Sequence, residues 1–192
     1  YKSRHRFDTP RGYESHRTTI RLLQGFRGSM GDWDWDTAIV ISEAKSKQDN
    51  YGRQSMTLLD AALAKSTSDA YNPFCGGNCS DESSFTMNIF RGNTTSLHMW
   101  DFKMTNPNVY ELPAGPVGML IGAEIRKEAY TDDRDPRING TIPYTVPVGP
   151  RAGLTFPLIS DIVNSSATPD SNGSRVTSSF FTELQIPITD KI

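Results

Sequence analysis

Apolar and polar residues alternate along several stretches of the chain, and this alternation constrains the fold more than any other feature. The clearest stretch carries Val117, Met119, Ile121, Ala123 and Ile125 on one parity, with glycines and charged residues on the other. Similar runs occupy 17–27, 33–42 and 175–188. A period of two residues predicts β-strands with one apolar and one polar face.

The connections between these stretches alternate in length. Residues 28–32 and 112–116 are rich in glycine and proline, so each predicts a tight turn. The segments 45–95 and 130–174 are long and polar, and within the first of them 56–65 has the spacing of a short helix. Short turns that alternate with long loops are typical of outer-membrane barrels, which have short periplasmic turns and long extracellular loops.

The composition excludes one class of membrane protein and leaves another open. Only 36% of the 192 residues are hydrophobic, and nowhere does an apolar run approach the roughly 20 residues of a membrane-spanning helix. A transmembrane β-barrel needs apolar residues at every second position only, so this composition suits it. The net charge of −2 gives no general reason to bind nucleic acid. We therefore predict an all-β fold of antiparallel transmembrane β-barrel strands, present as a partial barrel.

Four motifs resemble one known family. They are WDWD at 33–36, YNPF at 71–74, ELPAGPVGMLIGAEIRKE at 111–128 and SRVTSSFFTELQIPI at 174–188. In this order they resemble TonB-dependent outer-membrane receptors of Gram-negative bacteria. Ile125 stands where the family more often has a tyrosine, a change that leaves the alternation intact.

The resemblance implies energised uptake of a bulky nutrient across the outer membrane of a Gram-negative bacterium. Such receptors have a plug domain and a barrel of about 22 strands, so residues 1–192 are expected to be an interior fragment of one barrel domain. The implied partners are the rest of the barrel and its plug, the TonB complex, outer-membrane lipid and an unidentified nutrient ligand. The long loops at about 45–95 and 130–174 are expected to face outward.

Aromatic residues in these two loops are the candidates for contact with a ligand, because aromatic rings suit sugars or peptides. The candidates are Tyr71, Phe74, Phe85, Phe90, Tyr144 and Phe156.

The two cysteines of the chain, Cys75 and Cys79, are separated by three residues that include two glycines. In an exported protein such a pair predicts a disulfide, since disulfides persist in oxidising compartments. A structural zinc site needs more ligands than this pair supplies, and the histidines show no convergent spacing. The run 132–135 lacks the glycine and the terminal glutamate of a calcium loop. We expect no metal and no cofactor.

No catalytic motif occurs in the sequence, so an enzyme is not expected. One alternative fold explains the alternation. In a soluble, exported β-sandwich that binds carbohydrate or protein, the apolar parity would form the core between two sheets. A sandwich gives no reason for short and long loops to alternate.

Overall fold

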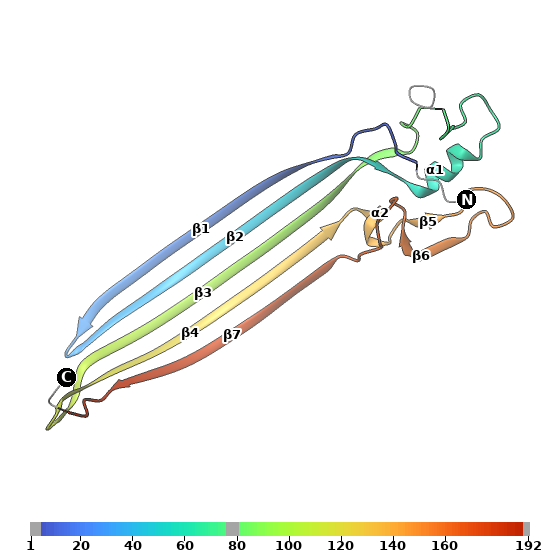
Figure 1. Ribbon diagram of the computed structural model, residues 1–192. Helices are drawn as coiled ribbons and strands as arrows, with labels where there is room; N and C mark the ends of the chain where they lie inside the picture. Colours follow the sequence, from blue (N-terminus) through green and yellow to red (C-terminus); the bar gives the residue numbers. More distant parts are fainter. Residues whose placement is uncertain (1–4, 76–80, 190–192) are drawn as a thin grey trace. The chain divides into compact units, whose positions relative to one another are not determined.

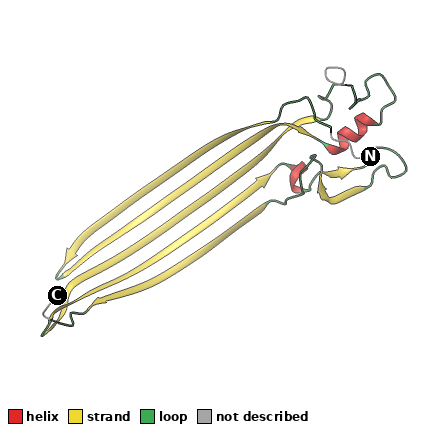
Figure 2. Ribbon diagram, in the orientation of Figure 1, coloured by secondary structure: helices red, strands yellow, loops and turns green. Residues whose placement is uncertain are grey.

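The computed structural model describes residues 5–75 and 81–189. Antiparallel β-sheet dominates, with 64% of residues in strands, so the predicted all-β class is confirmed. The main sheet has the strand order β1-β2-β3-β4-β7 (Figures 1 and 2). Its strands are β1 (Gly12–Met30), β2 (Trp33–Gln54), β3 (Thr86–Leu112), β4 (Gly115–Arg134) and β7 (Ser171–Gln185). β1 and β7 are its edge strands.

Two hairpins form where the sequence predicts tight turns. β1 and β2 meet at Gly31, whose φ of 62° is readily adopted only by residues such as glycine. Across this turn the Ser29 hydroxyl donates a hydrogen bond of 2.6 Å to Asp34 Oδ1. β3 and β4 meet at Gly115, which also has a positive φ, of 127°. Each turn therefore depends on a glycine to reverse the chain.

The strands run further than the sequence pattern indicates. β2 continues to Gln54 and β3 begins at Thr86, so both ends of the predicted loop 45–95 are strand. β4 likewise continues to Arg134, and β7 begins at Ser171. In these extensions both parities are largely polar, so no alternation marks them.

Two short helices follow the ends of β2 and β4. α1 (Met56–Leu63) begins at its N-cap Ser55, whose hydroxyl accepts a hydrogen bond from the Leu58 amide, as predicted for a helix in this segment. α2 (Pro136–Asn139) begins after Asp135, which caps the Arg137 amide, and ends at Gly140 with a φ of 92°. The capping residues explain why each helix starts where it does.

The chain divides into two compact units. Unit 1 comprises Tyr1–Arg17, Ser46–Asn93 and Thr131–Ser171, and unit 2 comprises Thr18–Lys45, Thr94–Tyr130 and Asn172–Ile192. Both helices and a small hairpin of β5 (Pro143–Thr145) and β6 (Thr155–Ser160) belong to unit 1. Unit 2 consists mainly of the sheet strands that carry the alternation.

Unit 1 has a small apolar core. Tyr71 and Phe85 pack edge to face with ring centroids 4.8 Å apart, and Ala62 of α1 is buried beside them. Phe7 and Leu59 cover this cluster. The core therefore joins α1 to the segments on either side of it.

A buried polar network joins the two long connections of unit 1. Asp161 is fully buried, and its carboxylate accepts hydrogen bonds from the Ser55 hydroxyl (2.6 Å) and the Thr57 amide (2.9 Å). Arg137 completes the network with an ion pair to the same carboxylate. Ser55, Thr57 and Arg137 are all far from Asp161 in the sequence. The network therefore holds the segments that carry them together.

Candidate functional site

In unit 2 the polar parities of all the strands lie on one face of the sheet. Contacts between neighbouring strands establish this: Ser29 with Asp34, Lys103 Nζ with Asp36 Oδ1 at 3.4 Å, and Arg175 Nε with Glu128 Oε2 at 2.5 Å. We call this surface the polar face. It carries Arg21, Arg27, Asp34, Asp36, Ser42, Lys103, Glu124, Arg126, Glu128 and Arg175.

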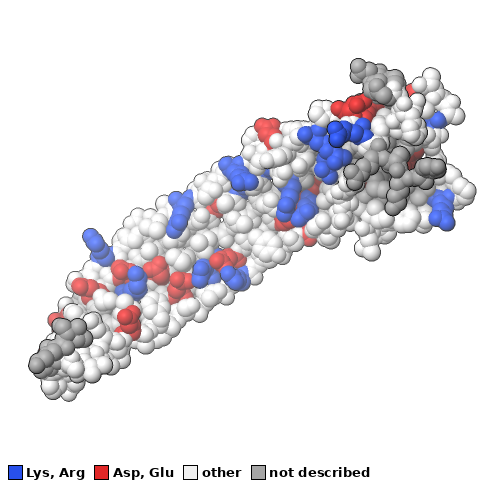
Figure 3. All heavy atoms as spheres, in the orientation of Figure 1, with Lys and Arg blue, Asp and Glu red and all other residues white. Residues whose placement is uncertain are grey.

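Acidic and basic side chains are interspersed on the polar face and not separated into blocks. Arg126 Nε lies 3.3 Å from Glu124 Oε1, and its Nη1 lies 4.0 Å from Glu128 Oε1. Figure 3 shows positive and negative side chains mixed along the strands. These pairs are substantially solvent-exposed, so each adds little stability. Together they make the polar face hydrophilic, with similar numbers of acidic and basic side chains.

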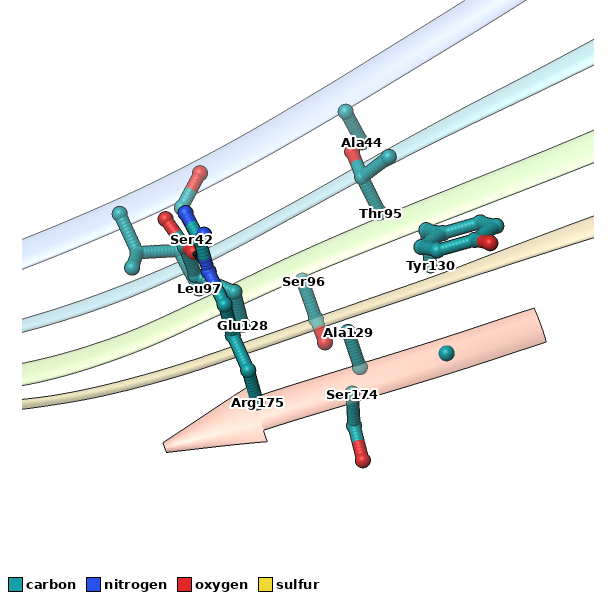
Figure 4. Close-up of a pocket in the computed structure, with 11 residues that line it drawn as sticks. Ser42, Ala44, Thr95, Ser96, Leu97, Glu128, Ala129, Tyr130, Ser174 and Arg175 are labelled. Atoms are coloured by element: carbon teal, nitrogen blue, oxygen red, sulfur yellow. Dashed lines mark hydrogen bonds and ion pairs between the residues drawn. The ribbon is translucent and has the colours of Figure 1, made fainter. Parts of the chain in front are cut away.

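The polar face contains a hollow of about 600 Å³. Ser42, Leu97, Glu128 and Arg175 reach it from four neighbouring strands (Figure 4). At its rim the Tyr130 ring lies over Gly173, where an added Cβ would be 2.8 Å from Tyr130 Cε1. The charged groups of the hollow, Glu128 and Arg175, pair with each other, and the rest of its lining is a mixture of small, hydroxyl and apolar side chains.

The apolar parities lie on the opposite face of the same strands, because successive side chains of a strand point to opposite sides. We call this surface the apolar face. It is open: Ile20 is 66% exposed and Phe180 is 75% exposed. It carries Ile20, Leu22, Phe26, Trp33, Trp35, Ile39, Ile41, Trp100, Phe102, Ile125, Val176, Phe180 and Leu184. Monomeric soluble proteins rarely expose an apolar surface of this extent.

All three tryptophans of the chain belong to the apolar face. Trp33 and Trp35 flank Asp34 at the β1–β2 turn, and Trp100 stacks on Phe102 with ring centroids 6.4 Å apart. Trp35 fills the space above Gly28, where an added Cβ would lie 2.9 Å from the indole ring. Amphipathic rings at the ends of an apolar band are typical of membrane-interface girdles.

Two of the aromatic residues expected to face a ligand are core residues instead. Phe85 has no exposed surface, and Tyr71 is only 8% exposed. The Tyr71 hydroxyl donates a hydrogen bond of 3.1 Å to Glu82 Oε1. Burial, followed by this hydrogen bond, raises the pKa of Tyr71 to about 12. The expectation that these two rings contact a ligand is therefore corrected, because a packed ring has no free surface.

The other aromatic candidates keep part of their surface. Tyr144 and Phe156 face each other across the β5–β6 hairpin and stack with ring centroids 5.8 Å apart. The Tyr144 hydroxyl donates a hydrogen bond to Asp60, which raises the pKa of Tyr144. Phe74 is 86% exposed, whereas Phe90 is half-buried within β3. A ligand role for these four rings stays a prediction.

Asp132 is the centre of an arginine cluster in unit 1. Arg91 binds both carboxylate oxygens at 2.8 Å, and Arg134 Nη2 lies 2.8 Å from Oδ2. The hydrogen bonds from Arg91 outweigh the effect of burial and lower the pKa of Asp132. Both guanidinium groups are held by the Asp132 carboxylate, so we assign this arrangement to stability and not to ligand binding.

The structure describes only one of the two cysteines. Cys75 is disulfide-bonded, while Cys79 lies outside the described residues. The pairing of Cys75 with Cys79 therefore stays a prediction. Within residues 5–75 and 81–189, no group of three or more His, Cys, Asp or Glu side chains is arranged to hold a metal ion. Over the same residues, no helix has the length and apolarity needed to cross a bilayer.

Sequence reasoning missed the buried polar residues that organise unit 1. Asp161, Gln54 and Ser160 are fully buried, yet each lies in a polar segment with no periodicity to mark it. Glu82 was missed as well, although its carboxylate holds the Asp8 and Thr9 amides at 3.0 and 2.8 Å. Their partners are distant in the sequence, so no local signal identifies them.

Comparisons with known proteins identify no relative of this chain. No protein-family model, curated protein or solved structure matches the chain.

Proposed function

We propose that this chain forms part of the wall of a TonB-dependent receptor in the outer membrane of a Gram-negative bacterium. In this proposal the apolar face contacts lipid, and the polar face lines the water-filled interior of a barrel. The receptor would import a bulky nutrient, with energy supplied by the TonB complex. The observation that carries the proposal is the exposed apolar face, which extends over five neighbouring strands.

The two faces have the properties that a barrel wall needs. Lipid-facing residues of such barrels are apolar and alternate with interior residues that are polar. The apolar parts of β1, β2, β4 and β7 have the length needed to cross a bilayer at a tilt, roughly 9–11 residues. The tight turns at Gly31 and Gly115 lie at one end of the hairpins, and the long connections of unit 1 follow the other ends of the strands. The proposal requires β1 and β7 to pair with further strands, because an open sheet edge is not stable in lipid.

The β-sandwich alternative is less well supported. Its core would be made by the apolar parities, so side chains such as Ile39 and Phe180 would be covered. Instead Ile39 is 49% exposed, and most other members of the apolar face are similarly open. A soluble sheet would leave this surface in water at a large hydrophobic cost.

A pair of arginine substitutions on β2 tests the proposal. Ile39→Arg places a charge on the apolar face and should disfavour folding into lipid vesicles by about 2–4 kcal/mol if the site lies near the bilayer centre. Ser42→Arg places the same charge on the polar face, where Glu128 lines the same hollow, and should be tolerated. The measurement is a denaturant titration of folding into vesicles. Equal effects of the two substitutions would contradict the proposal.

A further inference from the structure

Five of the arginines that the structure describes in unit 1 have no acidic partner: Arg6, Arg11, Arg17, Arg53 and Arg151. Several other arginines of this unit pair with carboxylates, as Arg91 and Arg134 do with Asp132. Within the described part of the chain, Arg6, Arg11 and Arg53 form no ion pair. A guanidinium without a carboxylate partner has an uncompensated charge and can bind an anion.

Arg53 has the least favourable environment of Arg6, Arg11 and Arg53. Its Nε atom is buried and has no hydrogen-bond partner among the described residues, although the residue as a whole is half-buried. Burial and then the positive charge of Arg11 lower the pKa of Arg53. Two like charges near each other, one of them partly removed from water, raise the free energy of the empty site. An anion bound at Arg11 would offset this repulsion.

The positions of Arg11 and Arg53 are fixed by the backbone and by a buried amide. Gly52 has a φ of 65°, and a Cβ added there would lie 2.2 Å from the Pro10 carbonyl oxygen. Only glycine allows this close approach, which brings residues 10 and 11 against residue 52. The fully buried Gln54 then accepts a hydrogen bond of 2.6 Å from Arg11 Nη2 and donates one of 2.9 Å to the Gly52 carbonyl.

A cavity of about 390 Å³ is lined by Arg11 of this pair and by Arg6, whereas Arg53 is not among its lining residues. Its walls offer hydrogen-bond donors, and no described carboxylate lines it. The lining residues are His5, Arg6, Phe7, Thr9, Pro10, Arg11 and Asn164. The carboxylate of Glu82, which holds the Thr9 amide, is already occupied by two backbone amides and the Tyr71 hydroxyl.

We propose that Arg6 and Arg11, which line this cavity, form a binding site for an acidic group, a carboxylate or a phosphate, on a ligand of this protein. Guanidinium groups bind both anions through paired, charge-assisted hydrogen bonds. The inference rests on unit 1 alone, so it stands whether or not the strands cross a membrane. The binding experiment below tests the anion site, whereas folding of the Ile39 and Ser42 variants into vesicles tests the membrane proposal, so the two failures can be told apart.

The test is equilibrium binding to the purified protein in detergent micelles, measured by titration calorimetry with three probes. Inorganic phosphate and citrate represent free anions, and micelles containing phosphatidylglycerol represent a lipid headgroup. We expect saturable binding of at least one probe, weakened by added salt. Arg6→Gln and Arg11→Gln should each weaken it by about tenfold or more, since each removes charge-assisted hydrogen bonds.

Arg151→Gln is the matched control, because Arg151 is an exposed arginine of unit 1 outside the cavity. It should leave the affinity unchanged. Arg11→Lys keeps the charge but loses the planar fork, so it should bind with intermediate affinity. Arg6 and Arg11 are both exposed, so the circular dichroism of both glutamine variants should match that of the unmodified protein. Absence of saturable binding for all three probes, or binding that Arg11→Gln leaves unchanged, would overturn the proposal.

Discussion

The Phe181 ring of β7 packs directly against Gly122 of β4. A Cβ atom added at Gly122 would lie 2.3 Å from Phe181 Cζ, far inside van der Waals contact. An aromatic ring that covers a glycine on the neighbouring strand stabilises the pairing and protects the exposed backbone. Gly122 therefore marks the position where β7, an edge strand of the sheet, is held to β4.

We expect Gly122→Ala to destabilise the protein by about 1–3 kcal/mol, because Phe181 must leave its position. Gly92→Ala is the control, since Gly92 lies in strand β3 with its nearest neighbour, Asp133 Cβ, at 4.0 Å. This second variant should be neutral or slightly stabilising. Denaturant unfolding in micelles measures both. Equal stability of the two variants would show that the packing of the Phe181 ring does not require a glycine at position 122.

Asp161→Ala should destabilise unit 1 by about 3–5 kcal/mol, because the change leaves the Arg137 guanidinium without its buried partner. The loops joined by Ser55 and Asp161 should then become sensitive to limited proteolysis. Asp69→Ala is the control: its ion pair with Lys65 is solvent-exposed, so the stability should hardly change. A proteolysis pattern that is the same in Asp161→Ala and the unmodified protein would refute the assigned role.

Phe85→Ala should destabilise the protein by about 3–5 kcal/mol, since it empties the centre of the unit 1 core. Phe74→Ala removes a ring that is 86% exposed and should leave thermal stability unchanged. The melting temperatures of the two variants provide the comparison. If Phe85→Ala melts like the unmodified protein, the ring is not a core residue.

Unit 1 should lose stability in acid because of Asp132. Its pKa in the folded protein lies below the ordinary value of 3.8, so the Asp132 carboxylate stabilises the fold above that pH. The stabilisation is lost as the pH falls through the lowered pKa. Arg91→Gln should reduce the slope of stability against pH below about pH 4, whereas Arg151→Gln should not. Identical slopes in the two variants would contradict this assignment.

The alternation predicted the sheet of unit 2 well. Both hairpin turns and the polar and apolar parities could be read from the sequence, because each depends on residues close together in the chain. The same holds for the helical spacing that predicted α1 in unit 1. Val117 to Ile125 show the reason: one face is apolar and the other is not, so the strand has a detectable period.

The organisation of unit 1 could not be predicted in the same way. The strand extensions 46–54 and 86–95 have polar residues on both parities, so they lack the amphipathic signal. The aromatic ring of Phe85 looks like that of Phe74 in the sequence, and only tertiary packing separates a core ring from an exposed one. The pairings of Asp161 with Ser55 and of Arg11 with Gln54 join residues far apart in the chain.

The tryptophans provide the most direct test of the claim that the apolar face contacts lipid. Trp33, Trp35 and Trp100 all lie on that face, and they are the only tryptophans of the chain. The measurement is tryptophan fluorescence of the intact protein in vesicles made with brominated or ordinary phospholipids. We predict strong quenching by the bromine atoms, together with weak quenching by aqueous acrylamide. Equal fluorescence in the two lipids, with full quenching by acrylamide, would contradict the account.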